Sequence, residues 1–317
     1  MTSESDFIAS LRALATEPAA RCLLDDAAVL SVGEGKLVLT HDMMIEGVHF
    51  LKDDPPGDIA WKLVAVNISD LAAKGARPIG ILLGYSLGHS DEWDAAFTAG
   101  LRDAAEHFHV ALLGGDTVSM PPDAPMALGL TAIGEALTPR VPSRAGARAG
   151  DILWVTGTIG DKGAGLRIAR GEIAGSARLL GSYRRPEPRA EAGQALAPYV
   201  NAMMDVSDGL LIDASRLANA SGVAAEIDLD CVPLSRDYVA LCGDGQAERL
   251  AAATAGDDYE LLFAAAPRQS DTVFTIARSM GMAFTPVGRL QKGEGITLID
   301  SNGPVPLPGR LGYEHVS

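Results

Sequence analysis

The chain has 317 residues, a formal net charge of −15, 47% apolar residues and 21% charged residues. This length and composition are typical of a globular protein with an ample core and room for two domains, and they exclude a largely disordered chain. The acid excess argues against a nucleic-acid-binding protein, which needs a basic surface, but it is compatible with phosphate chemistry because metal ions bridge acidic side chains to phosphates.

Three cysteines, Cys22, Cys231 and Cys242, are scattered along the chain without CxxC spacing. Their odd number and spacing argue against a disulfide framework or a structural zinc site, so we expect buried or incidental thiols. Residues 1–9 lack the basic start and apolar run of a signal peptide, and no apolar stretch is long enough to span a bilayer. A cytoplasmic location is therefore expected.

Apolar periodicity and turn residues predict alternating strands and helices in the first half of the chain. The expected elements are strands at 27–32 and 36–40, a helix at 59–74, a strand at 79–87, a helix at 92–107, and strands at 110–113 and 126–133. Proline, arginine and glycine then crowd residues 139–150. We place the domain boundary there, between a domain of residues 1–145 and one of residues 146–317.

The second half continues the alternation. The expected elements are a strand at 151–156, a glycine-rich turn at 157–165 that opens a helix, a strand at 203–206, a helix at 210–220, strands at 224–229 and 260–265, and a helix at 274–280. The pattern predicts an α/β or α+β chain, although periodicity alone does not say which strands pair.

Acidic residues recur at strand ends or beside glycines. They are Asp25-Asp26, Asp42, Asp70, Asp116, Asp205 with Asp208, and Asp257-Asp258. Magnesium prefers carboxylate oxygens and completes its shell with water and substrate phosphates, so aspartates gathered by the fold would suit it. Turn residues and helix caps are the alternative for each of them. Asp53-Asp54, before two prolines, looks like a plain solvated turn.

Asp70 lies inside an apolar helix, on the same face as Asn67 and Lys74. Aspartate is a poor helix former, so this position is either a solvated face or a presentation of the carboxylate to a metal. The flanking apolar residues favour the second interpretation.

Two segments could bind phosphate. Asp205 to Gly209 combines two acids, a hydroxyl and a glycine before a helix, where unpaired amides attract anions; a simple cap by Ser207 or Asp208 is the alternative. The turn at 157–165 fails both the P-loop and the GxGxxG templates, so a tight strand-to-helix turn explains it equally well.

His41 and His49 flank residues 43–48 without HExxH spacing, and no GxSxG elbow occurs. Zinc-dependent and serine-dependent hydrolysis therefore have little support.

Read together, these segments resemble the thiamine-monophosphate kinase family, in order and spacing from about residue 25 to the C-terminus. The matching stretches are Asp25-Asp26-Ala27, residues 40–50, residues 66–76, Gly114-Gly115-Asp116-Thr117, residues 155–161, residues 205–209 and residues 256–261. Each motif is modest, but the ordered set is specific.

The resemblance implies a two-domain synthetase-like fold. Its N-terminal domain holds ATP and metal and dimerises through a mixed sheet, and its C-terminal α/β domain completes the active site. It also implies ATP-dependent phosphorylation of thiamine monophosphate to thiamine diphosphate, with several Mg²⁺ ions, in a homodimer.

The family pattern also implies roles for individual residues. Metal ligands fall at Asp26, Thr40, His41, Asp42, Asp70, Asp116, Asp205 and Asp208; ATP contacts fall at Gly115, Arg144 and Ser207; acceptor contacts fall at His49 and Asp257, with Arg310 at a position where the family often has an aromatic residue and Tyr313 nearby. The chain departs from the pattern at Leu24, where glycine is usual, at His41, where a small hydroxyl is usual, and at Val48, where a polar residue is usual.

We expect direct, in-line transfer without a catalytic side chain, because the acceptor phosphate oxygen is already a nucleophile. The alternatives are another ATP-using synthetase of the same group acting on a different small acceptor, and a non-catalytic divalent-cation-binding protein. Cys22 lacks the glycine-rich setting of selenophosphate synthetases, the chain ends without the cysteine of hydrogenase-maturation relatives, and no EF-hand spacing occurs.

Overall fold

The computed structural model describes residues 8–9, 11–12, 14–87, 90–121 and 123–314. The segment 1–9, expected to lack a signal peptide, therefore lies almost entirely outside the described residues. So do the last three residues of the chain.

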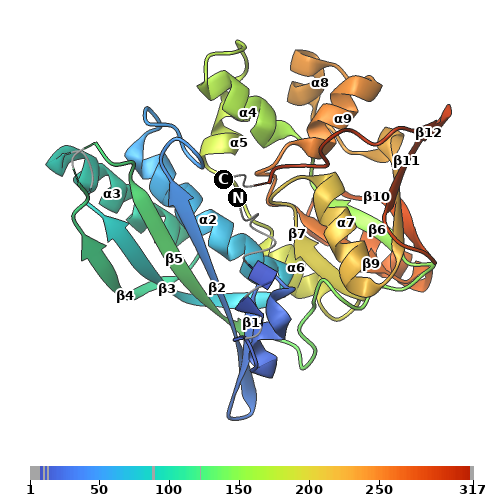
Figure 1. Cartoon of the computed structure of the whole chain (residues 1–317), viewed down its shortest axis with the longest axis horizontal. Helices are drawn as coiled ribbons and strands as arrows, with labels where there is room; N and C mark the ends of the chain where they lie inside the picture. Colours follow the sequence, from blue (N-terminus) through green and yellow to red (C-terminus); the bar gives the residue numbers. More distant parts are fainter. Residues whose placement is uncertain (1–7, 10, 13, 88–89, 122, 315–317) are drawn as a thin grey trace.

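A mixed five-stranded sheet forms the N-terminal half of the molecule (Figure 1). Its strands are β1 (Ala28–Val32), β2 (Gly35–Ile45), β3 (Ala76–Ser86), β4 (Ala111–Val118) and β5 (Ala127–Ala136), in the order β1-β2-β5-β3-β4. β3 and β4 pair in parallel, and the other neighbours pair antiparallel. Helices α2 (Pro56–Ala73) and α3 (Asp91–His107) cover one face. We call the opposite face the open sheet face.

A seven-stranded sheet forms the C-terminal half, in the order β12-β11-β8-β10-β6-β9-β7. Its strands are β6 (Ile152–Thr156), β7 (Ala202–Asp205), β8 (Ala224–Asp228), β9 (Leu261–Ala265), β10 (Phe284–Gln291), β11 (Ile296–Asp300) and β12 (Gly303–Val305). The helices of this half are α4 (Asp161–Ala169), α5 (Ala177–Arg184), α6 (Ala190–Leu196), α7 (Leu210–Ser221), α8 (Arg236–Cys242), α9 (Gln246–Thr254) and α10 (Ser270–Ser279). Short 3₁₀ turns lie at Pro18–Leu23, Leu229–Cys231 and Pro267–Gln269.

Helix α2 belongs to the cores of both halves. Of its 18 residues, 14 are buried, because apolar side chains surround the whole helix. Leu63 and Ile68 pack in the core under the N-terminal sheet, whereas Ala72 and Ala73 pack with Met203 and other residues of the C-terminal half. The polar side chains Ser69 and Asp70 near its end therefore lie between the two sheets, in the region that we call the seam.

The predicted α/β class is confirmed, and every predicted strand and helix occurs with shifted ends. Strands β2 to β5 extend beyond the predicted segments, because ladder pairing continues through polar residues and glycines. Sequence reasoning missed helices α5, α6, α8 and α9 and strands β10 to β12.

The expected burial of the thiols is wrong. Cys22 and Cys231 are exposed and Cys242 is half-buried, and all three are free. Incidental thiols remain as the interpretation.

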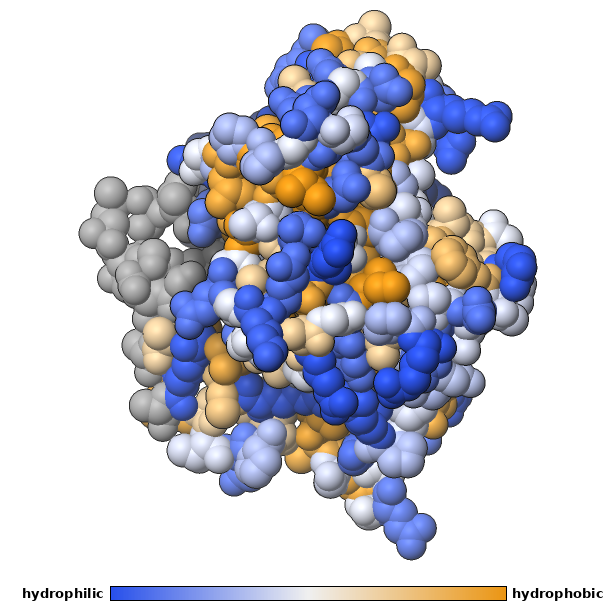
Figure 2. Space-filling model, turned by 90° about the vertical axis from the view of Figure 1, so that its right-hand side faces the viewer, coloured by the Kyte–Doolittle hydropathy of each residue, from blue (hydrophilic) through white to orange (hydrophobic). Residues whose placement is uncertain are grey.

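The face of the C-terminal half seen in Figure 2 mixes hydrophilic residues with small apolar patches. Among the described residues, no helix is both long and apolar enough to cross a membrane.

The crossing of α2 and α3 requires a glycine. A Cβ atom on Gly100 would lie 2.3 Å from the backbone of Gly57, where no side chain can yield. We expect Gly100→Ala to destabilise the protein by about 1–3 kcal/mol, the usual cost of overpacking, in urea unfolding monitored by circular dichroism.

Gly181 in α5 provides the matched control, because a Cβ there would meet nothing within 4 Å. Gly181→Ala should be neutral or stabilising by about 0.5–1 kcal/mol, because it removes backbone freedom from the unfolded chain. Equal unfolding midpoints for the two variants would contradict this account of the helix crossing.

Candidate active site

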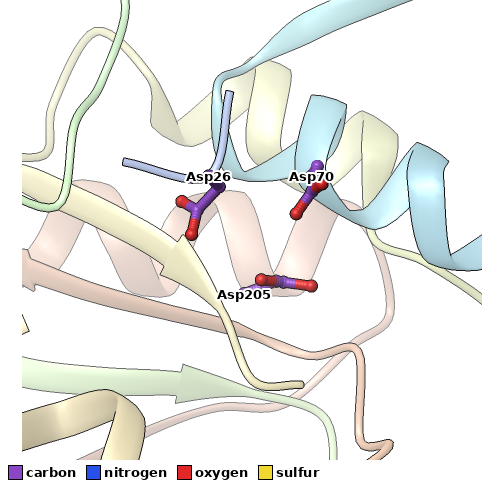
Figure 3. Close-up of side chains that lie close together, drawn as sticks. All are labelled: Asp26, Asp70 and Asp205. Atoms are coloured by element: carbon purple, nitrogen blue, oxygen red, sulfur yellow. The ribbon is translucent and has the colours of Figure 1, made fainter. Parts of the chain in front are cut away.

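Three carboxylates from distant parts of the chain converge in the seam between the sheets. Asp26 precedes β1, Asp70 lies in the last turns of α2, and Asp205 ends β7 (Figure 3). One oxygen from each lies within 4.8 Å of the others. The predicted gathering of these three aspartates is therefore present in the structure.

Neighbouring hydroxyls orient two of these carboxylates. The Thr40 hydroxyl donates a hydrogen bond to Asp70, and the Ser69 hydroxyl donates one to Asp205 at 2.7 Å. Asn67 accepts a hydrogen bond from the backbone N–H of Asp42 at 3.1 Å, which ties β2 to α2. The polar side of α2 thus fixes the geometry of the acidic cluster.

The cluster is electrostatically unfavourable without a cation. Burial, with repulsion from Asp26 and Asp208, raises the pKa of Asp42 to about 6. Burial, with repulsion chiefly from Asp26, raises the pKa of Asp205 to about 8. Burial and three neighbouring aspartates also raise the pKa of Asp70. Like charges in a dry seam disfavour ionisation, and a bound cation would reverse the effect.

The donor set fits a hard divalent cation. Asp26 Oδ2 is buried and has no hydrogen-bond partner among the described residues, although the Lys74 ammonium lies 2.5 Å away. The other oxygen, Oδ1, accepts a hydrogen bond from Arg144 Nε at 2.6 Å. Carboxylate and hydroxyl oxygens are the ligands that magnesium prefers, so Asp26, Asp70 and Asp205 would hold such an ion, with Thr40 beside them.

Asp25 has a different role from its neighbour. Its side chain is 3% exposed and accepts hydrogen bonds from Lys74, at 2.5 Å, and from Arg21. Although burial acts to raise it, the pKa of Asp25 is lowered by these two cations. Asp25 thus anchors Lys74 beside the cluster.

The turn at 205–209 does not leave its amides free for phosphate. The Asp213 carboxylate, on the first turn of α7, accepts hydrogen bonds from the backbone N–H groups of Ser207, Asp208 and Gly209 at 3.1–3.2 Å. Of the two interpretations left open for this turn, the structure favours a capped helix start, although Asp213 supplies the cap in place of Ser207 or Asp208. Asp208 remains close enough to the cluster for its charge to help raise the pKa of Asp42.

The end of the chain packs against this turn. The Tyr313 backbone N–H donates to the Asp208 carbonyl at 2.9 Å, and the Asp208 carboxylate pairs with Arg216. Arg310 is exposed, and the contact with the turn is made by the backbone of Tyr313.

Three further predicted site residues lie away from the carboxylates, on the open sheet face or on the edge strand β4: His41, Gly115 and Asp116. Side chains alternate along a strand, so His41 points away from Thr40 and Asp42, and its imidazole Nδ1 lies 2.9 Å from the Thr131 hydroxyl on the open sheet face. The structure does not bring the His41 ring to the carboxylates.

Asp116 and Gly115 lie on the exposed edge strand β4. Asp116 pairs with Gly84, which pairs in turn with Gly129 beside Met43 on the open sheet face. The structure therefore does not bring the Asp116 carboxylate to the cluster. A Cβ on Gly115 would lie 1.9 Å from the Leu83 carbonyl oxygen, so strand packing alone requires this glycine.

The glycine-rich turn at 157–165 is filled by the protein itself. A Cβ on Gly157 would lie 2.3 Å from a Glu260 carboxylate oxygen, and the Gly160 amide donates to Asp258 at 2.9 Å. Of the two interpretations left open by the sequence, the structure favours the tight strand-to-helix turn.

His49 and Asp257 meet at Lys62, about two turns before Asp70 on α2. The His49 carbonyl and the Asp257 carboxylate both accept hydrogen bonds from Lys62, at 3.0 and 2.6 Å. Although burial acts to raise it, the pKa of Asp257 is lowered chiefly by Lys62. The two predicted acceptor residues are therefore brought together, through a lysine that the sequence analysis did not consider.

Asp54 is not the solvated turn residue that was expected. It is 6% exposed and accepts hydrogen bonds from the Leu51 N–H at 2.9 Å and the Tyr183 hydroxyl at 2.8 Å.

The sequence analysis also missed two residues that shape the site, Asp213 and Ser69. An aspartate four residues after Gly209, at the start of a predicted helix, is a capping signal that could have identified Asp213.

Two family models match the chain in succession. Residues 24–136 match the AIR synthase related protein, N-terminal domain, and residues 148–301 match the AIR synthase related protein, C-terminal domain.

Characterised relatives align along nearly the whole chain. A thiamine-monophosphate kinase from Caulobacter vibrioides is 39% identical over 99% of this chain and 91% of its own length. A thiamine-monophosphate kinase from Salmonella typhimurium is 36% identical over 92% of this chain and 90% of its own length. The solved structure of AaThiL complexed with AMPPCP and TMP superimposes with a TM-score of 0.86 at 30% identity, covering 99% of this chain and 97% of that chain.

The raised pKa of Asp205 predicts a pH-dependent stability. With a folded pKa of about 8 against an ordinary value of 3.8, the carboxyl is neutral in the folded protein and ionised in the unfolded chain between these limits. Folding then takes up a proton, so the contribution of Asp205 to stability falls as the pH rises from about 4 to about 8.

Thermal unfolding in EDTA between pH 5 and pH 8 measures this contribution. As the pH rises, the Tm of Asp205→Asn should increase relative to the Tm of the unsubstituted protein, because the amide does not titrate. Magnesium should reduce the difference in slope, since a cation favours the ionised carboxylate. Parallel pH curves in EDTA would show that Asp205 ionises normally.

Proposed function

This chain belongs to the thiamine-monophosphate kinase family, and we propose from that premise that it transfers a phosphoryl group from ATP to thiamine monophosphate by direct, magnesium-assisted, in-line transfer. The observation that carries the proposal is the convergence of Asp26, Asp70 and Asp205 between the two domains. Such a site suits two anionic substrates that a cation must bring together.

The problem that the site must solve is electrostatic. Two unit charges about 4 Å apart repel by roughly 4 kcal/mol at an effective dielectric near 20. When bound, magnesium would neutralise charge on the phosphates and hold them in line. The proposal assigns the ion to Asp26, Asp70 and Asp205, with Thr40, Asp42 and Asp208 around it.

The cationic side chains of the seam would assist the nucleotide. Arg144 pairs with Asp26, and Lys74 lies between Asp25 and Asp26. The proposal has Arg144 turn towards the phosphates of ATP once a metal ion neutralises Asp26. Ser207 lies on the neighbouring turn, where its hydroxyl would contact the nucleotide.

No general base is needed, because the terminal oxygens of thiamine monophosphate are already nucleophilic. The chain's own work is to orient the acceptor and to exclude water from the seam. His49 and Asp257 would contact the acceptor, which would then lie near Lys62, about two turns before Asp70 on α2.

Another ATP-using synthetase activity on a different small acceptor is the alternative. The full-length similarity to thiamine-monophosphate kinases favours thiamine monophosphate over other acceptors. We place this activity in the cytoplasm.

The turnover experiment uses magnesium-ATP with and without thiamine monophosphate, following ADP release and identifying the product by mass. We expect ADP release to depend on thiamine monophosphate and to yield thiamine diphosphate. Asp70→Asn should lower kcat/KM by at least about 100-fold, because it removes a cation ligand.

Asp53→Asn is the matched control, because Asp53 is exposed on the turn before α2 and should tolerate the change. ATP hydrolysis without thiamine diphosphate would move the acceptor to another member of the synthetase group. A normal rate for Asp70→Asn would remove Asp70 from the metal site.

A homodimer formed through the open sheet face is part of the proposal. Large apolar side chains lie on this face with 39–54% of their area exposed: Leu30, Val32, Met43 and Leu82. An exposed apolar sheet face of this kind is typical of a surface that associates. A second copy would also cover His41 and Asp116.

The dimer predicts a light-scattering mass of about twice the 32.9 kDa chain. The double variant Met43→Lys/Leu82→Lys should give the mass of a single chain, because two charges would enter an apolar interface. Leu307→Lys, at an exposed leucine after β12, should leave the mass unchanged. A monomeric unsubstituted protein, or a dimeric double variant, would exclude this interface.

A further inference from the structure

Lys62 is a buried lysine that the phosphoryl-transfer chemistry does not use. Its side chain is 4% exposed, on the face of α2 that meets the C-terminal domain. The ammonium donates to the His49 carbonyl at 3.0 Å and to Asp257 Oδ2 at 2.6 Å. It also lies 4.4 Å from the centre of the Tyr183 ring. A desolvated ammonium requires such partners, because it has left its hydration shell.

We propose that Lys62 is the positioning residue of the acceptor subsite, holding the His49 loop and the Asp257 carboxylate in register across the two domains. This inference rests on the proposed function, in which His49 and Asp257 contact thiamine monophosphate. Asp257 has 32% of its side chain exposed, whereas Lys62 is buried behind it. Lys62 therefore acts through these two residues and does not touch the acceptor.

The His49 side of the contact is fixed at two points. Lys62 holds the carbonyl, and the ring nitrogen Nδ1 accepts a hydrogen bond from the Ile45 N–H at 3.0 Å. The loop after β2 therefore has its backbone fixed to α2 and the His49 imidazole fixed to the end of β2. A shift of the Lys62 ammonium would release one of these two restraints.

The Asp257 side is strained and needs support. Asp257 has a φ of 68°, in the left-handed region that disfavours residues with a Cβ. Its N–H donates to the Ser207 carbonyl at 2.6 Å, and its Oδ1 accepts from the Tyr259 hydroxyl at 2.8 Å. Lys62 holds the other oxygen, so the carboxylate is clamped from both sides.

A second ion pair on the same helix provides a control that distinguishes a positioning role from a general effect on stability. Asp58, one turn before Lys62, pairs with Arg185 at 2.5 Å, and the Arg185 guanidinium lies 5.2 Å from the Trp61 ring. This pair also joins α2 to the C-terminal domain, at Trp61 and not at His49 or Asp257. Arg185→Met therefore removes a more exposed bridge between the same two domains while leaving the acceptor subsite in place.

The test compares steady-state kinetics of Lys62→Met with those of Arg185→Met in the full-length protein. Lys62→Met should raise the KM for thiamine monophosphate by about tenfold or more, while the KM for ATP stays within about twofold. Arg185→Met should leave both constants within about twofold. Lys62→Arg, which keeps the charge, should recover part of the loss.

Lys62→Gln guards against a variant that fails to fold, because the amide can still donate to the His49 carbonyl. It should also raise the KM for thiamine monophosphate selectively. An unchanged KM in the soluble lysine variants, or equal rises for both substrates, would overturn the positioning role while leaving the kinase activity intact. An unsubstituted protein that does not turn over thiamine monophosphate would overturn the proposed function, and this inference with it.

Discussion

Carboxylates buried against one another are the constraint to which the rest of this molecule responds. At a separation of 4.8 Å, two ionised carboxylates repel by roughly 3 kcal/mol at an effective dielectric near 20. Two features reduce this repulsion. Lys74 and Arg144 lie against Asp26, and burial raises the pKa of Asp205 so that its carboxyl holds a proton. Both the ion pairs and the protonation are reversible, as the proposed site for metal and phosphate requires.

Helix α2 makes this arrangement possible because it is apolar on every side and yet carries polar groups to the seam. Its leucines and isoleucines pack under the N-terminal sheet, and its last alanines pack against the other domain. Three of its polar side chains therefore lie in the seam: Lys62, Ser69 and Asp70. The same helix thus presents a cation towards the proposed acceptor and carboxylates towards the proposed metal, with the orientation of both set by one rigid element.

Local patterns predicted most strands and the helices α2, α3, α4, α7 and α10, because these follow from short-range periodicity, but they missed α5, α6, α8, α9 and β10 to β12. They also identified Asp26, Asp70 and Asp205 as acids at the right places. What they could not provide was pairing: Lys62 and Asp257 are 195 positions apart, and their contact exists only once two domains have packed. The sheet face on which His41 lies could have been predicted, because side chains alternate along a strand and His41 lies between Thr40 and Asp42. The side occupied by Asp116 depends on the register of three strand pairs.

The Asp213 carboxylate at the start of α7 changes the role of the turn beside it. A helix start with free amides is a receptor for an anion, whereas one that carries its own carboxylate is already saturated. Under the proposed function the nucleotide would then be recognised through cations, because the carboxylates would repel free ATP and attract its magnesium complex. The acidic cluster would therefore discriminate between charge states of the nucleotide before it discriminates between nucleotides.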